Sequence, residues 1–89
     1  MPIPGNRDEP DAAVERTHRR IRFGRRLRHM REERRLTQEG VALLANLDRS
    51  FYVQLEGGKR SISVERLEDL ARAFSVEIPD LFERDSHES

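Results

Sequence analysis

Apolar residues in the middle of the chain recur at spacings of three and four, which is the spacing of one face of an α-helix. Phe23, Leu27 and Met30 give such a face to a helix that ends near Arg35. Thr37 and Asp48 are good N-cap residues for a second and a third helix. The inward faces of these two helices consist of Val41, Ala42 and Ala45, and of Tyr52 and Leu55.

The residues between these faces favour turns. Asn46 tolerates the left-handed conformation of a tight turn, and Gly57-Gly58 ends the third helix. Ser63 caps a fourth helix, and after a turn at Ser75-Val76 a short fifth helix carries Pro79 in its first turn. The apolar residues of these last two helices are Leu67, Leu70, Ala71, Phe74, Leu81 and Phe82. The chain shows no strand-like alternation and no repeat, so the pattern predicts an all-α fold of five short helices around one core.

The two ends differ from this central region. The first ten residues hold three prolines, and the last seven, ERDSHES, hold no apolar residue. Asp11 is a plausible N-cap for a helix that either continues into the next segment or breaks at Gly24, where a close packing contact is the alternative. We therefore divide the chain into a flexible arm over 1–18 that is helical in part, a domain over 19–83 and a disordered acidic tail over 84–89.

Composition excludes several classes of function. The 89 residues leave room for one domain, and the absence of cysteine excludes disulfides and thiolate sites. No apolar run is long enough to span a bilayer and no signal peptide is evident, so we expect a cytoplasmic protein. His18, His29 and His87 are too far apart to suggest a metal site, and no residues form a recognisable catalytic or cofactor-binding motif. We expect no enzyme activity, no metal and no cofactor.

The formal net charge is zero, but the charges are unevenly distributed. Ten arginines between 16 and 35 are opposed there only by Glu32 and Glu33, whereas the segment from Glu77 to the end is mainly acidic. A partner meets this local field and not the net charge. The basic run is compatible both with a solvated helix and with a field that supports contacts to DNA phosphates. The ten residues are Arg16, Arg19, Arg20, Arg22, Arg25, Arg26, Arg28, Arg31, Arg34 and Arg35.

The segment from Thr37 to Glu56 has the layout of a helix-turn-helix, whose second helix fits a DNA major groove. The stretches FGRRLRHMREERRLTQ, VALLANLDRS, LEGGKRSISVERLEDLARAFSV and IPDLF resemble the Cro/CI-type helix-turn-helix regulators, the XRE family. Within that family, ANLDRSF is most similar to the controller proteins of restriction–modification systems. The resemblance implies a five-helix lambda-repressor-like domain that binds double-stranded DNA through its second and third helices.

The resemblance also implies roles for individual residues. The base-reading residues are Arg49, Ser50, Phe51 and Gln54, and the phosphate-binding residues are Thr37, Gln38, Lys59 and Arg60. An arginine at position 49 can contact guanine O6 and N7 together, and Gln54 can bond adenine or reach a phosphate. Phe51 either touches DNA or packs on the flank of its helix. Arg31 and Glu56 match an internal ion pair.

From the resemblance we expect a transcriptional regulator. One recognition helix covers only a few base pairs, so we expect the protein to act as a homodimer on a palindromic operator. The expected dimer interface is Ile78, Leu81 and Phe82. Glu39 matches an acidic position through which some relatives touch RNA polymerase, and its alternative role is a favourable charge in a first helical turn. Two other functions remain open: the DNA-binding antitoxin of a toxin–antitoxin pair, and a protein–protein adaptor on the same fold.

Overall fold

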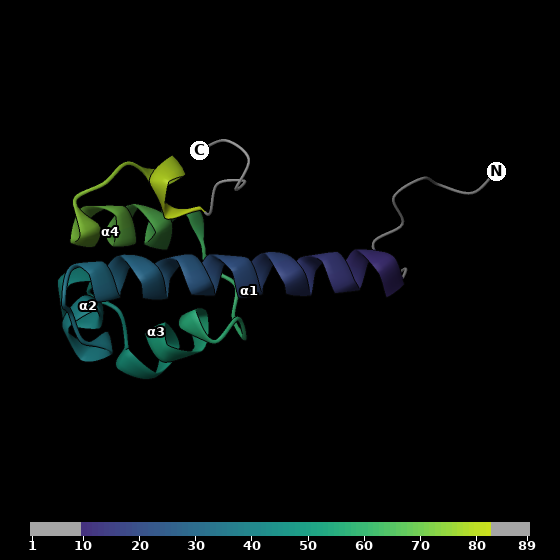
Figure 1. Ribbon diagram of the computed structural model, residues 1–89, viewed down its shortest axis with the longest axis horizontal. Coiled ribbons are helices and arrows are strands. Elements are labelled where there is room, and N and C mark those ends of the chain that lie inside the picture. The colour runs from purple at the N-terminus through teal and green to yellow at the C-terminus, as the bar shows by residue number, and fades with distance from the viewer. Residues whose placement is uncertain (1–9, 83–89) are drawn as a thin grey trace.

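The computed structural model describes residues 10–82. The first nine residues of the predicted arm and the predicted tail over 84–89 lie outside this range. Within it the chain forms four α-helices and one 3₁₀ helix (Figure 1). The elements are α1 Pro10–Glu33, α2 Gln38–Ala45, α3 Arg49–Glu56, α4 Val64–Phe74 and the 3₁₀ helix η1 Ile78–Leu81. The all-α fold with its helix-turn-helix at α2 and α3 is therefore confirmed.

Helix α1 is one continuous helix of 24 residues and does not break at Gly24. A Cβ atom at Gly24 would lie 2.4 Å from the carbonyl oxygens of Leu55 and Glu56, which belong to the last turn of α3. Of the two roles considered for this glycine, the close packing contact is therefore the correct one. The N-terminal part of α1, including residues 10–18, extends beyond the other helices (Figure 1).

The core lies where the other elements meet the C-terminal half of α1, which contributes Phe23, Leu27 and Met30. Helix α3 lies on one side of α1, while α4 and η1 lie on the other (Figure 1). Helix α2 contacts both α3 and α4 and so closes the end of the bundle. The buried apolar residues are Phe23, Leu27, Met30, Val41, Ala42, Ala45, Tyr52, Leu55, Leu70, Ala71, Phe74 and Leu81. They include most of the residues that the helical spacing predicts, and Leu67 packs against them while partly buried.

The N-caps predicted for α2, α3 and α4 are confirmed by their hydrogen bonds, whereas Asp11, the N-cap predicted for the first helix, lies inside the first turn of α1 because that helix already begins at Pro10. The side chains of Thr37, Asp48 and Ser63 each accept a hydrogen bond from the backbone N–H group three residues later. These bonds satisfy donors that the first turn of a helix leaves without an intrahelical partner. Asn46 adopts the left-handed conformation with φ of 55°, and Ser75 ends α4 in the same way with φ of 59°.

The fifth helix is a single 3₁₀ turn of four residues, held by reciprocal bonds between Glu77 and Asp80. It packs against α4 and α1, and this contact buries Leu81 completely within its own chain. Leu81 therefore belongs to the core of its own chain, and its place in a dimer interface stays a prediction. Phe82 remains 45% exposed and Ile78 is half-buried.

No helix within residues 10–82 combines the length and the apolar character that a membrane crossing requires.

Candidate nucleic-acid interface

The turn between α2 and α3 fixes the direction of α3. It consists of residues 46–48, and the N–H group of Leu47 donates to the carbonyl oxygen of Ala42 at 2.8 Å. Tyr52 and Leu55 bury one face of α3 in the core. The opposite face is therefore turned to solvent, as docking into a major groove requires.

That exposed face borders a surface hollow with a volume of about 430 Å³. Gln38 contributes to it from the first position of α2, and the other lining residues come from α3: Arg49, Ser50, Val53 and Gln54. The structure therefore brings together three of the four predicted base-reading residues and one predicted phosphate-binding residue. Phe51 is not among the lining residues; it is half-buried and packs against the core.

The carboxylate of Glu56 connects three helices beneath this face. Arg31 on α1 donates to it from Nε at 2.6 Å and from its second terminal nitrogen at 3.1 Å, which confirms the expected ion pair. Gln38 on α2 donates its side-chain amide to the same carboxylate at 3.1 Å. Burial alone would raise the pKa of Glu56, but the hydrogen bonds, chiefly that from Arg31, outweigh it and hold the pKa below its usual value.

Tyr52 places a phenol beside the same ion pair. Its hydroxyl is buried and makes no hydrogen bond within residues 10–82. Burial and the neighbouring carboxylate of Glu56 together raise the pKa of the phenol, so the group stays protonated. The ring itself serves as core, as the apolar spacing predicts.

The loop after α3 brings Arg60 back against Gln54 and Phe51 of that helix. Gly58 makes this possible because it adopts φ of 73° and is buried against Ile21 of α1. Arg60 then donates to the side-chain oxygen of Gln54 at 3.1 Å, and its guanidinium lies 5.2 Å from the centre of the Phe51 ring. Lys59, the other predicted phosphate ligand of this loop, has an exposed side chain.

Part of the arginine-rich run has a structural role that the sequence does not reveal. Arg26 donates to the carbonyl oxygen of Asp80 at 3.0 Å, which ties α1 to η1. Arg34 donates to the carbonyl oxygen of Phe74 at 3.2 Å and lies over its ring. Any residue has a backbone carbonyl, so the sequence does not show which arginines bind one. It could therefore not distinguish Arg26 and Arg34 from arginines whose side chains are solvated.

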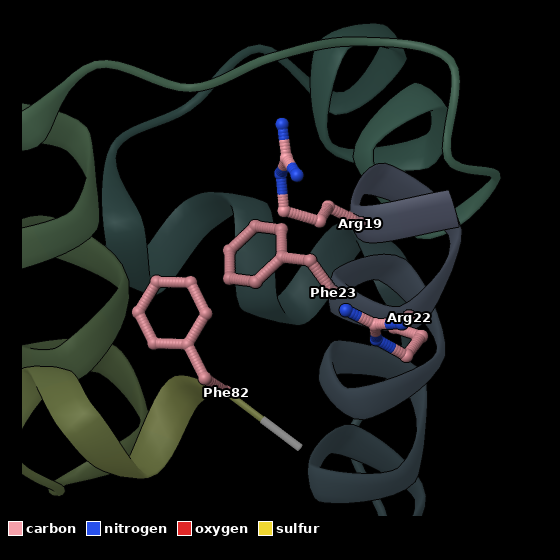
Figure 2. Close-up of a pocket in the computed structure, with 4 residues that line it drawn as sticks. All are labelled: Arg19, Arg22, Phe23 and Phe82. Carbon is pink, nitrogen blue, oxygen red and sulfur yellow. The ribbon is translucent and has the colours of Figure 1, made fainter. Parts of the chain in front are cut away.

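A second, smaller hollow of about 150 Å³ lies between α1 and the end of η1 (Figure 2). It is lined by Arg19, Arg22, Phe23 and Phe82. The two phenyl rings lie side by side with their centres 5.3 Å apart. The pairing of Phe23 with Phe82 depends on where η1 packs, so the sequence gives no indication of it.

Comparison with known proteins identifies the same domain. The family model described as a helix-turn-helix domain matches residues 22–84. The chain is 38% identical over 64 residues to the control protein C.MunI of Mycoplasma sp, covering 71% of this chain and 86% of that protein. It is 29% identical over 65 residues to the control protein C.BamHI of Bacillus amyloliquefaciens, covering 72% and 80%.

Its structure is also similar to the crystal structure of the restriction-modification controller protein C.AhdI from Aeromonas hydrophila. The TM-score is 0.69 with 40% sequence identity, and the match covers 71% of this chain and 96% of that chain.

Proposed function

This chain belongs to the helix-turn-helix domain family and is a DNA-binding transcriptional regulator, and we propose that it acts as the controller protein of a restriction–modification system, binding as a homodimer to a palindromic operator. The observation that carries the proposal is the hollow shared by Gln38 and the outer face of α3. The names of C.MunI, C.BamHI and C.AhdI supply the biological context. The site of action would be the cytoplasm.

In this proposal the first exposed turn of α3 reads bases. Arg49 and Ser50 are both exposed and lie at its N-terminal end. A guanidinium group placed there can donate two hydrogen bonds to guanine, which distinguishes this base from the other three.

Phosphates would be held by the N-terminus of α2 and by the loop that follows α3. The N-terminus of α2 offers free backbone N–H groups, and Gln38 keeps a second amide hydrogen beside the one it gives to Glu56. The Thr37 hydroxyl accepts a bond from the Gly40 N–H group, so its own hydrogen is available for a phosphate oxygen. Lys59 and Arg60 follow the C-terminal end of α3 and are both exposed.

The proposed dimer interface includes Phe82 and Ile78, with Leu81 supporting them from beneath. Phe82 exposes almost half of its surface next to the hollow that it shares with Phe23, and aromatic side chains of this kind are enriched in interfaces. Glu39, which is exposed in the first turn of α2, would be free to contact RNA polymerase beside the DNA.

Selection of bound sequences from random duplex DNA tests the operator, and sedimentation of the protein with the selected duplex tests the stoichiometry. We expect an inverted repeat with half-site centres about one helical turn apart, and two protein chains per duplex. Replacing Phe82 with glutamate should prevent two chains from binding one duplex together. The matched control Leu43→Glu, at a residue of α2 that is 76% exposed, should leave two chains per duplex. A single unrepeated site bound by one chain would contradict the homodimer. Genes for a methyltransferase and a nuclease beside this one would support the controller role.

A further inference from the structure

We propose that Gln54 reads a hydrogen-bond acceptor, with guanine preferred over adenine, because Arg60 holds the carbonyl end of its side-chain amide. Arg60 is then a positioning residue that sets specificity through Gln54, in addition to any phosphate it touches. The inference rests on the proposed function only in placing the outer face of α3 in the major groove.

The orientation of the amide follows from the chemistry of its partner. Arg60 approaches Gln54 at 3.1 Å from a terminal guanidinium nitrogen. A guanidinium group has donors and no acceptor, so the atom facing it has to be the carbonyl oxygen and not the amide nitrogen. Because the two ends of a primary amide diverge, the amide nitrogen of Gln54 is directed away from Arg60.

Besides its bond to Gln54, Arg60 is held by a contact with Phe51, and both Phe51 and the adjoining loop are fixed in turn. Its guanidinium lies 5.2 Å from the centre of the Phe51 ring, within the range of a cation–π interaction. The neighbouring residue Lys59 donates its backbone N–H to the backbone oxygen of Gln54 at 2.9 Å, which holds the loop close to α3. Phe51 is itself packed against the core, so the stack gives Arg60 a firm support.

This arrangement changes what Gln54 can recognise. A free glutamine pairs with adenine because its oxygen accepts from N6 while its nitrogen donates to N7. In this structure the oxygen is held beside a positive charge, which disfavours the approach of the positively polarised N6 amino group. Guanine presents two acceptors, O6 and N7, and no donor at the same edge. Gln54 lines the hollow of the reading face, and its amide nitrogen is the end of the side chain that Arg60 leaves available to donate to guanine.

The test compares the sequences selected by the full-length wild-type protein and by Q54A. The base pair at which Q54A loses preference is the position read by Gln54. Affinities of wild type, R60A, Q54A and the double variant are then measured for duplexes with guanine or adenine at that position. We expect wild type to favour guanine by about tenfold, which is at the lower end of a good base contact.

R60A should lose this preference, and in the Q54A background R60A should cause no further change in it. Both side chains lie at the protein surface, so thermal unfolding should show that the variants remain folded. Three results would overturn the inference: wild-type preference for adenine, no position affected by Q54A, or an equal loss of affinity for both duplexes in R60A with the preference retained. The last result would make Arg60 a phosphate ligand only.

The results that would overturn this inference differ from the results that would overturn the proposed function. Loss of the inverted repeat or of the two-chain complex would remove the controller-type homodimer and leave the base preference at position 54 intact. A protein without any sequence-specific DNA binding would overturn both.

Discussion

Arg31 and Glu56 form an ion pair with two hydrogen bonds, at 2.6 and 3.1 Å, that joins α1 to the last residue of α3. The side chains are only 14% and 5% exposed, so water screens the pair weakly. The same carboxylate holds Gln38 at the start of α2. One acidic group therefore fixes the recognition helix relative to α1 and positions a residue at the edge of the candidate DNA interface.

Replacing Glu56 with alanine should lower the free energy of unfolding by about 3 kcal/mol, because Arg31 then remains as a poorly hydrated charge without its partner. Glu56→Gln should lower the free energy of unfolding by less, since the amide oxygen of the glutamine can still accept a hydrogen bond from Arg31. Urea unfolding at neutral pH measures both changes.

The matched control is Glu32→Ala, which removes the exposed pair between Glu32 and Arg28 within α1. Exposed pairs contribute about 1 kcal/mol or less, so this change should have little effect. Equal losses for Glu56→Ala and Glu32→Ala would contradict the structural role of the buried pair.

The stability of the fold should depend on pH through Glu56. Because the folded state holds the pKa of this carboxyl below its usual value, the folded state binds its proton less readily than the unfolded chain does. The resulting stabilisation is present above the unfolded pKa of about 4.3 and is lost as the pH falls through the lower folded pKa. Unfolding curves at pH 7, 5, 4 and 3 should show wild type approaching Glu56→Gln at the acid end. A constant difference between the two proteins over this range would refute the assignment.

The fold could be predicted largely from the sequence because its signals are local. The N-caps Thr37, Asp48 and Ser63 and the left-handed residue Asn46 act within a few residues of chain, and helical spacing identifies most of the core. The 3₁₀ form of η1 and the burial of Leu81 depend on packing against α1 and α4, so the periodicity alone could not distinguish Leu81 from its exposed neighbour Phe82.

The sequence named most of the residues that line the hollow and the Arg31–Glu56 ion pair beneath it, but not the bond between Arg60 and Gln54. The resemblance to a family assigned Gln38, Arg49 and Gln54 to the interface, and the structure places them around one hollow. It could not assign the bond from Arg60 to Gln54, because that contact depends on how the loop through Gly58 packs on α1. The two partners of a side-chain contact across a loop have no fixed spacing along the chain. A sequence pattern therefore cannot identify them, and only the tertiary structure does.

Gly24 should not tolerate a side chain. In Gly24→Ala the new Cβ would approach the backbone oxygens of Leu55 and Glu56 to 2.4 Å, so α1 and α3 would have to separate. We expect the free energy of unfolding to fall by about 2 kcal/mol, since overpacking of this kind outweighs the gain in helix propensity of about 1 kcal/mol. Thermal unfolding measures the change.

Gly57→Ala serves as the comparison for Gly24→Ala. Gly57 has φ of −80°, and a Cβ there would make contacts of 3.6 Å or longer. This variant should be as stable as wild type or more stable by less than about 1 kcal/mol, because alanine restricts the unfolded chain. A Gly24→Ala protein that unfolds at the wild-type temperature would show that the contact between α1 and α3 is looser than the structure indicates.

Arg49 and Lys59 should affect DNA binding in two different ways. Both side chains are exposed, so either can be replaced by alanine without loss of folding. If Arg49 reads guanine, Arg49→Ala should weaken binding to the selected operator by about 1–3 kcal/mol and relax the preference at one base pair. If Lys59 holds a phosphate, Lys59→Ala should weaken binding to all sequences alike and lower the slope of log K against log salt concentration by about 1.

Titrations of both variants with the operator and with a scrambled duplex, at several salt concentrations, separate these two effects. If Arg49→Ala weakens binding to the operator and to the scrambled duplex equally and also lowers the salt slope, Arg49 contacts phosphate and does not read a base. Specificity would then have to come from Ser50 and Gln54, the other polar residues of α3 that line the hollow.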